Sequence, residues 1–182
     1  MSEALAWNIP IDSIGDGLKL ERSATPEELT AVAASLGIPA CGPLAARFTI
    51  KALPRGRFRL AGSLEADVVQ SCVVSLDPVP DHVSETFEVE LCPPDQLTVV
   101  EVEEVDLDDA PSILDVADEE PLAGNAIPVG RIVFETLATG LDPYPRAPGV
   151  ALEISEAGGP TETDSPFAVL ARLTGKPPTE PE

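Results

Sequence analysis

Apolar and polar side chains alternate along two long stretches of the first half of the chain. In residues 44–52 and 58–68 the even-numbered positions are apolar or glycine, and most odd-numbered positions are polar. Because successive side chains of a β-strand point to opposite faces, this period predicts two half-buried strands. The even-numbered apolar series continues through Cys72 and Leu76, so we expect the second strand to reach Leu76 with the Cys72 thiol on its buried face.

The two predicted strands are joined by Pro54, Arg55 and Gly56. Both apolar series are even-numbered and must share one face, so the numbers of antiparallel partners must sum to an even number. A three-residue turn meets this condition. It pairs Lys51 with Arg59 and places Gly56 in the left-handed conformation of a bulged turn. A turn of two or four residues would instead place charged side chains in the core.

Helices are predicted from apolar spacing and from signals at the helix ends. A capping-box sequence that begins at Thr25 precedes apolar residues at helical spacing, and Gly37 follows them. This arrangement predicts a helix over residues 25–36. The same spacing predicts a second helix over residues 128–140 and a short terminal helix over residues 165–173.

Shorter alternating segments predict further strands. We expect an edge strand over residues 7–11, a strand over residues 83–91 that follows a turn at 77–81, and an acidic strand over residues 97–105. Consecutive strands joined by tight turns are typical of antiparallel sheets. The predicted fold class is α+β, with an antiparallel, strongly bent or barrel-like sheet and two to three short helices.

The chain is strongly acidic. Its 182 residues include 11 Lys and Arg against 32 Asp and Glu, a formal charge of −21. Residues 60–130 contain 18 of the acidic residues and no Lys or Arg. This segment is either a solvated face or a binding site for a cationic partner, and the overall charge excludes an ordinary nucleic-acid-binding protein. The acidic residues that we assign to partner binding are Glu101, Glu103, Glu104, Asp106, Asp108 and Asp109.

One domain is predicted over residues 1–150, including a mobile acidic segment at about 104–124 that has few large apolar residues. Residues 151–164 follow as a linker, and residues 165–182 as a short terminal helix and a disordered tail. No basic region precedes an apolar run at the N-terminus, and nowhere do about 18 apolar residues follow one another. We therefore expect a cytoplasmic protein without a membrane partner.

Few side chains of the sequence could carry catalysis. His82 is the single histidine, and the spacing of Cys41, Cys72 and Cys92 fits neither a disulfide framework nor a zinc knuckle. The sequence contains no glycine-rich phosphate loop and no nucleophile elbow. We expect no enzymatic activity, no cofactor and no metal site, and we interpret His82 as a solvated side chain in a turn.

The predicted hairpin places several basic side chains on one polar face. Lys51 opposite Arg59 is a like-charge pair that needs an anionic neighbour. That neighbour is either a glutamate of the next strand, where Glu85, Glu88 and Glu90 are available, or an RNA phosphate. The candidate RNA contacts are Arg47, Lys51, Arg55, Arg57 and Arg59.

Two sequence motifs carry a resemblance to a known family. The first motif is Leu-Pro-Arg-Gly-Arg at 53–57 together with Val-Gln-Ser-Cys-Val-Val-Ser-Leu-Asp-Pro-Val at 69–79, and the second is Leu-Asp-Pro-Tyr-Pro-Arg at 141–146. Over residues 7–173 the chain resembles the YceD family, the large ribosomal RNA subunit accumulation proteins. The resemblance assigns structural roles to Gly56, Cys72, Asp142, Pro143, Tyr144, Pro145 and Arg146. Ser75 stands where many family members have a second cysteine, so no metal site is expected and Cys72 is interpreted as a core residue.

The resemblance implies a function in ribosome assembly. It implies a non-enzymatic biogenesis factor that supports the synthesis, processing or stability of the large-subunit (23S) ribosomal RNA. The implied partner is a large-subunit precursor or a basic ribosomal protein, with local RNA contact by the basic hairpin. The alternative is a general acidic adaptor or holding protein for a basic partner unrelated to ribosomes.

Overall fold

The computed structural model describes residues 4–97, 119–122 and 124–151. The chain divides into two units, Met1–Val150 and Ala151–Glu182. All the helices and strands described below belong to the first unit. Most of the acidic strand predicted over 97–105, the linker, the terminal helix and the tail lie outside the described residues.

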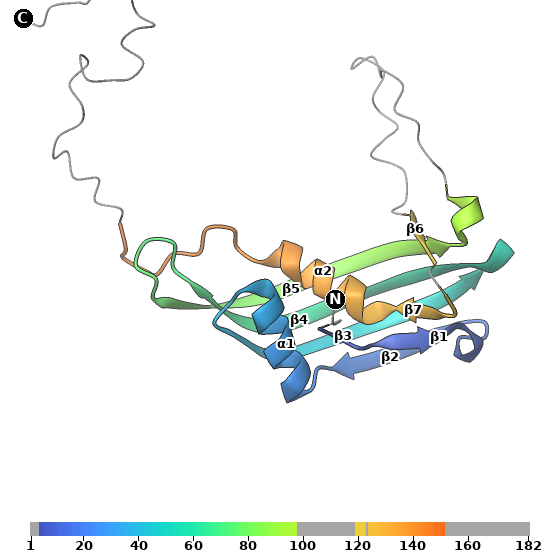
Figure 1. The fold of residues 1–182 in the computed structure, drawn as a ribbon, viewed down its shortest axis with the longest axis horizontal. Coiled ribbons are helices and arrows are strands. Elements are labelled where there is room, and N and C mark those ends of the chain that lie inside the picture. The colour runs from blue at the N-terminus through green and yellow to red at the C-terminus, as the bar shows by residue number, and fades with distance from the viewer. Residues whose placement is uncertain (1–3, 98–118, 123, 152–182) are drawn as a thin grey trace, which may run out of the picture. The chain divides into compact units, whose positions relative to one another are not determined.

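An open five-stranded sheet forms the centre of the first unit (Figure 1). Its strands, in spatial order, are β2 Leu18–Ser23, β3 Ala40–Leu53, β4 Arg57–Ser71, β5 Pro78–Cys92 and β6 Glu119–Pro121. Neighbouring strands are antiparallel except β5 and β6, which are parallel. The α+β class is confirmed. Because β2 and β6 form separate edges of the sheet, the expected barrel-like closure is not supported.

One face of this sheet is covered by the remaining elements. These are a small antiparallel pair of strands, β1 Asn8–Pro10 and β7 Ala126–Pro128, and two helices, α1 Pro26–Leu36 and α2 Val129–Gly140. Helix α1 contacts β3, and α2 contacts β5, β4 and β1. Trp7, Phe48, Ile127 and Leu137 meet in the core between these layers. Among the described residues, no helix is long and apolar enough to cross a membrane.

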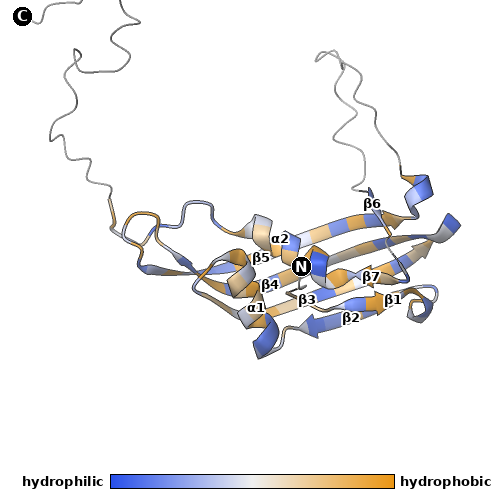
Figure 2. Ribbon diagram, in the orientation of Figure 1, coloured by the Kyte–Doolittle hydropathy of each residue, from blue (hydrophilic) through white to orange (hydrophobic). Residues whose placement is uncertain are grey.

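The alternation predicted for β3 and β4 is confirmed, and it separates the two faces of the sheet. The even-numbered positions Phe48, Ile50, Leu60 and Leu64 are buried, whereas the odd-numbered side chains between them lie on the opposite face. Figure 2 shows the resulting alternation of hydrophobic and hydrophilic residues along these strands. The face that carries the odd positions of β3 and β4 is therefore polar.

The turn between β3 and β4 has the predicted length and register. Residues Pro54–Gly56 form a three-residue turn, and Lys51 pairs with Arg59. Gly56 has a φ of +73°, the left-handed conformation that was expected. Arg55 also has a positive φ, of 66°, which the sequence did not indicate because arginine rarely adopts this conformation.

Helix α1 begins and ends where the sequence predicts. The Thr25 hydroxyl oxygen accepts a hydrogen bond from the Glu28 backbone N–H at 3.3 Å, and the Glu28 carboxylate accepts one from the Thr25 N–H at 2.9 Å. This reciprocal pair satisfies two backbone donors that the helix itself leaves unpaired. Gly37 ends the helix with a φ of +68°. Helix α2 begins at Val129, one residue after its predicted start.

Three sequence predictions about the strands are wrong. Strand β4 ends at Ser71, and residues 72–76 form a turn in which the Leu76 N–H donates to the Cys72 carbonyl at 3.0 Å. The apolar period of the sequence continues to Leu76 although the strand has already ended. Leu76 is consequently 76% exposed and not buried. Strand β5 already begins at Pro78 and not at the predicted residue 83. Proline is tolerated at the first residue of a strand, so Pro78 does not prevent this start. His82 consequently lies in a strand and not in a turn.

Three strands were missed in the sequence: the short β7, and β2 and β6 at the two edges of the five-stranded sheet. Strand β2 contains only Leu18 and Leu20 as large apolar residues, and its remaining side chains are charged or polar. Strand β6 has the sequence Glu-Glu-Pro and falls in the segment that was expected to be mobile. Both are edge strands, and neither has the apolar alternation from which a strand can be predicted.

Gly62 on β4 allows the sheet to pack closely, which gives a first prediction. A Cβ atom at this position would lie 2.5 Å from the Arg47 carbonyl oxygen, 2.8 Å from Phe48 Cβ and 2.8 Å from Phe87 Cζ. We expect Gly62→Ala to lower the free energy of unfolding by on the order of 1–3 kcal/mol, because backbone must move to relieve the clash. Urea denaturation measures this difference.

The matched control for this prediction is Gly17→Ala. Its Cβ would meet only the Ile50 carbonyl oxygen, at an ordinary 3.6 Å, so we expect unchanged or slightly raised stability. Equal stability of the two variants would contradict the packing that we describe around Gly62.

Candidate functional site

The basic side chains predicted to contact RNA do lie together, on the polar face and at the turn of the β3–β4 hairpin. Arg47 and Lys51 project from β3, Arg57 and Arg59 from β4, and Arg55 lies in the turn between them. We call these five residues the basic hairpin. Their partners decide whether this charge is available to a ligand.

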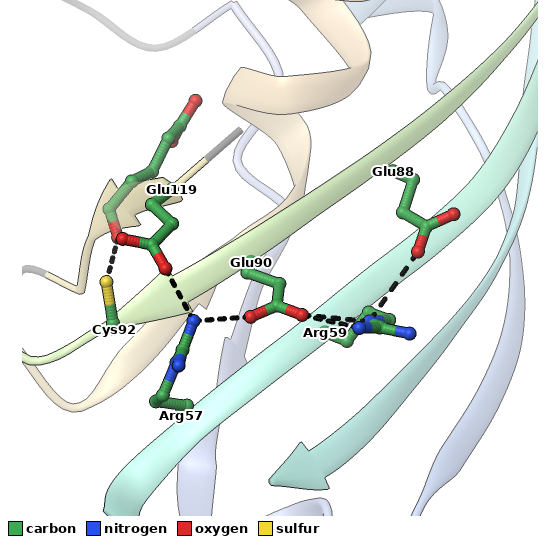
Figure 3. Close-up of polar contacts among 7 residues, drawn as sticks. Arg57, Arg59, Glu88, Glu90, Cys92 and Glu119 are labelled. Carbon is green, nitrogen blue, oxygen red and sulfur yellow. Dashed lines mark hydrogen bonds and ion pairs between the residues drawn. The ribbon is translucent and has the colours of Figure 1, made fainter. Parts of the chain in front are cut away.

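Two of the arginines are bound by a glutamate of the next strand. The Arg59 Nη2 atom lies 2.5 Å from Glu90 Oε1, and the Arg57 Nη2 atom lies 2.6 Å from Glu90 Oε2 (Figure 3). Arg59 Nε also lies 3.5 Å from Glu88 Oε1. Glu90 is only 8% exposed, so its charge is compensated by both guanidinium groups. The internal-partner interpretation is thus confirmed for Arg57 and Arg59.

The same network fixes the edge strand β6. Arg57 Nη2 lies 2.6 Å from Glu119 Oε1, a residue 62 positions further along the chain. The next residue, Glu120, is bound by Arg131 of α2, and its carbonyl oxygen accepts a hydrogen bond from Cys92 Sγ at 3.7 Å. Arg131 had not been assigned a role from the sequence, because nothing there indicates that α2 lies near these glutamates.

The remaining residues of the basic hairpin differ in their environment. Arg47 forms an exposed ion pair with Glu21 of β2 at 3.1 Å. Lys51 and Arg55 form no ion pair with any residue that the structure describes, and they stay candidate RNA contacts. The six carboxylates assigned to partner binding, in residues 101–109, lie outside the described residues.

The other end of the sheet, where β4 turns into β5, brings residues 69–79 of the first motif together with the second motif, whereas residues 53–57 lie at the β3–β4 turn. The Val73 N–H donates to the Pro145 carbonyl at 2.9 Å, and the Gln70 side-chain amide donates to the Asp142 carbonyl at 2.9 Å. The Asp142 carboxylate in turn accepts from the Tyr144 N–H at 2.8 Å. Figure 1 shows the segment after α2 beside this turn. Residues 69–79 and the second motif are therefore parts of one structural unit.

Cys72 lies inside this unit and is fully buried. Its sulfur accepts hydrogen bonds from the Val74 N–H at 3.5 Å and the Ser75 N–H at 3.4 Å. The Ala147 N–H makes the largest contribution to stabilising the thiolate, the Ser75 hydroxyl and these two N–H groups add to it, and together they lower the pKa of Cys72 to about 6 despite its burial. The prediction that Cys72 is buried is confirmed, although it lies in the turn and not in β4. In the described part of the chain, no three His, Cys, Asp or Glu side chains are grouped as metal ligands would be.

An open groove of about 630 Å³ lies at the same end of the sheet. Asp67 of β4 and Asp81 and His82 of β5 line it together with the start of β3, including Cys41. The His82 Nδ1 atom lies 2.7 Å from Asp67 Oδ1. Apart from the imidazole, the charged groups that line the groove are carboxylates, so it favours cations.

Comparison of the chain with protein-family models, with curated protein sequences and with solved structures finds no match. The residues and contacts described above therefore carry the proposal of a function. They divide the molecule into a hairpin whose charge is largely compensated and an opposite end that combines apolar and acidic groups.

Glu90 provides a second prediction. The Arg59 hydrogen bond makes the largest contribution to holding the pKa of Glu90 below its ordinary value of 4.5. A carboxylate of this kind stabilises the fold above pH 4.5, and the stabilisation is lost as the pH falls through the lowered pKa. We expect Glu90→Gln to lower the free energy of unfolding at pH 7 by about 1–3 kcal/mol, with a smaller difference in acid.

Glu88→Gln is the matched control for Glu90. The Glu88 side chain is 64% exposed and makes only a 3.5 Å contact, so we expect little change in stability. Urea denaturation at pH 7 and below pH 4 measures both variants, and equal effects would contradict a central role for Glu90.

His82 provides a third prediction. The hydrogen bond to Asp67 raises the pKa of His82 above its ordinary value of 6.5. Because the chain has one histidine, its imidazole C–H signal can be followed by NMR without ambiguity. We expect Asp67→Asn to shift the titration midpoint back towards 6.5, and Asp81→Asn to shift it less, since Asp81 acts only through weaker charge attraction.

The contact between His82 and Asp67 also makes the stability of the fold depend on pH. A histidine with a raised pKa stabilises the fold fully below pH 6.5, and the stabilisation is lost as the pH rises through the folded-state pKa. An NMR midpoint at or below 6.5 in the wild-type chain would show that the Asp67 contact is not formed in solution.

Proposed function

We propose that the chain is a non-enzymatic binding protein whose partner is basic. More particularly, we propose a cytoplasmic ribosome biogenesis factor that supports the synthesis, processing or stability of the large-subunit (23S) ribosomal RNA. The bound species would be a large-subunit precursor, contacted through one of its basic proteins. The observation that carries this proposal is the contact between residues 69–79 and the second motif, two of the segments on which the YceD resemblance depends.

These two segments are distant in the sequence and adjacent in the fold. Gln70 and Asp142 are 72 positions apart and are joined by a hydrogen bond, and Val73 is bonded to Pro145. The contact of the two segments supports treating them as one unit, and so supports the resemblance and the function that it implies.

The charge of the molecule favours a protein partner over RNA. The formal charge is −21, and Arg47, Arg57 and Arg59 are already paired with glutamates. Phosphate binding draws its affinity from cations that are free to release counterions from the nucleic acid, and few such cations are left here. A basic ribosomal protein, by contrast, is attracted by the same charge.

The second candidate is a general acidic adaptor or holding protein, and it is favoured by the same net charge. The two candidates differ in what the protein accompanies in the cell. A biogenesis factor travels with assembling subunits, whereas an adaptor follows its own basic client.

Sedimentation of cell extract distinguishes the two candidates and is the fourth prediction. We expect part of the protein to co-sediment with large-subunit precursors, and we expect its depletion to lower 23S ribosomal RNA relative to 16S. Protein that stays at the top of the gradient at low and physiological salt, together with an unchanged RNA ratio, would favour the general adaptor.

A further inference from the structure

The exposed large hydrophobic side chains of the described residues all belong to the β4–β5 end. Val73 is 47% exposed, Leu76 is 76% exposed and Tyr144 is 72% exposed. Val73 and Leu76 belong to the turn after β4, and Tyr144 belongs to the segment bonded to that turn. We call these three residues the apolar tip. Exposed apolar side chains scattered singly need no explanation, but a cluster formed by two distant segments is typical of an interaction site.

The backbone at the apolar tip is held in an energetically unfavourable conformation. Leu76 has a φ of +64°, a conformation that costs a non-glycine residue energy. Hydrogen bonds fix it there, from the Leu76 N–H to the Cys72 carbonyl at 3.0 Å and from the Cys72 N–H to the Asp77 carbonyl at 2.8 Å. The hydrogen-bonded backbone thus holds Leu76 at the surface, and its exposed side chain is available to a partner.

The surroundings of the apolar tip are acidic. Asp77 follows Leu76, Asp142 precedes Tyr144 by two residues, and Arg146 is the one basic residue of 141–150. The groove lined by Asp67 and by Asp81 opens at the same end, because Asp67 pairs with His82 only four positions before β4 ends at Ser71. An apolar centre with an acidic rim suits a partner that combines an apolar anchor with Lys or Arg.

We propose that the apolar tip and the acidic groove together form the docking site for a basic protein segment. The segment places an aliphatic or aromatic side chain against Leu76 and Tyr144, and a Lys or Arg side chain in the groove beside Asp67 and Asp81. Tyr144 offers a large amphipathic contact area with only two rotatable side-chain bonds, and the hydrogen-bonded backbone of Leu76 reduces the ordering that binding requires. This inference rests on the proposed function, whose partner surface it assigns.

Leu76→Gly is the decisive variant because it removes the side chain without straining the fold. Glycine adopts a φ of +64° readily, so the thermal stability of Leu76→Gly should equal or exceed that of the wild type. Tyr144→Ser is the second variant. Ala52→Ser, at an exposed position near the opposite end of the sheet, is the matched control.

The binding probe is the set of proteins extracted from purified large ribosomal subunits, each purified and titrated with the full-length chain. We expect at least one basic protein to bind the wild type, Leu76→Gly and Tyr144→Ser to weaken that binding tenfold or more, and Ala52→Ser to change it less than twofold. The double variant Asp67→Asn with Asp81→Asn should weaken binding and flatten its salt dependence.

Failure of the docking site can be told apart from failure of the proposed function. Binding that is unchanged in Leu76→Gly and Tyr144→Ser overturns the docking site, while co-sedimentation of the wild type with precursors would still support the function. Binding of 23S ribosomal RNA fragments that is lost in Arg55→Ser, with no extracted protein bound, overturns the assignment to a protein partner. A wild type that neither co-sediments nor binds any extracted protein overturns both.

Discussion

The register of the β3–β4 hairpin is the constraint on which the rest of this structure depends. A three-residue turn makes the partner numbers sum to an even value, so that the even-numbered apolar side chains of both strands face the same core. The same register places Lys51 opposite Arg59, which leaves positive charge on the polar face. One short turn therefore determines both the hydrophobic core and the charge that the neighbouring strands must compensate.

The compensation by Glu90 separates the molecule into two ends of different character. Glu90 is bound by Arg57 and by Arg59, and Arg57 also binds Glu119, which ties the edge strand β6 to the sheet. At the hairpin end, basic side chains are thus largely used within the chain. At the β4–β5 end, apolar side chains are exposed, and the nearby carboxylates Asp67, Asp81 and Asp142 form no ion pair with a Lys or Arg of the described residues. The ion pairs of the hairpin stabilise the fold, and the opposite end carries the proposed docking site.

The elements that the sequence predicts well are those with a local signal. The alternation around Phe48 and Leu60 gave the hairpin register, and the Thr25 capping box gave the start of α1, because each depends on residues close together in the chain. The pairing of Arg57 with Glu119 had no such signal, since it depends on where β6 lies in the sheet. The basic residues were found in the sequence, but their partners came from the tertiary structure.

The error at Leu76 shows why the apolar tip could not be predicted. Apolar residues recur at even-numbered positions through Cys72 to Leu76. This two-residue period indicates a continuing strand. The backbone instead turns at Cys72. There the sulfur accepts hydrogen bonds from two backbone N–H groups, and Val73 is hydrogen-bonded to the second motif. Leu76 is thereby exposed, although its position in the pattern is that of a buried residue.

The central claim is that the chain binds its partner with the β4–β5 end and not with the basic hairpin. Amide hydrogen–deuterium exchange of the full-length chain, with and without the proteins of the large ribosomal subunit, tests it most directly. The predicted result is added protection at residues 72–77 and 142–147, with residues 54–59 unchanged. Added protection at residues 54–59, with the apolar tip unchanged, would contradict the claim.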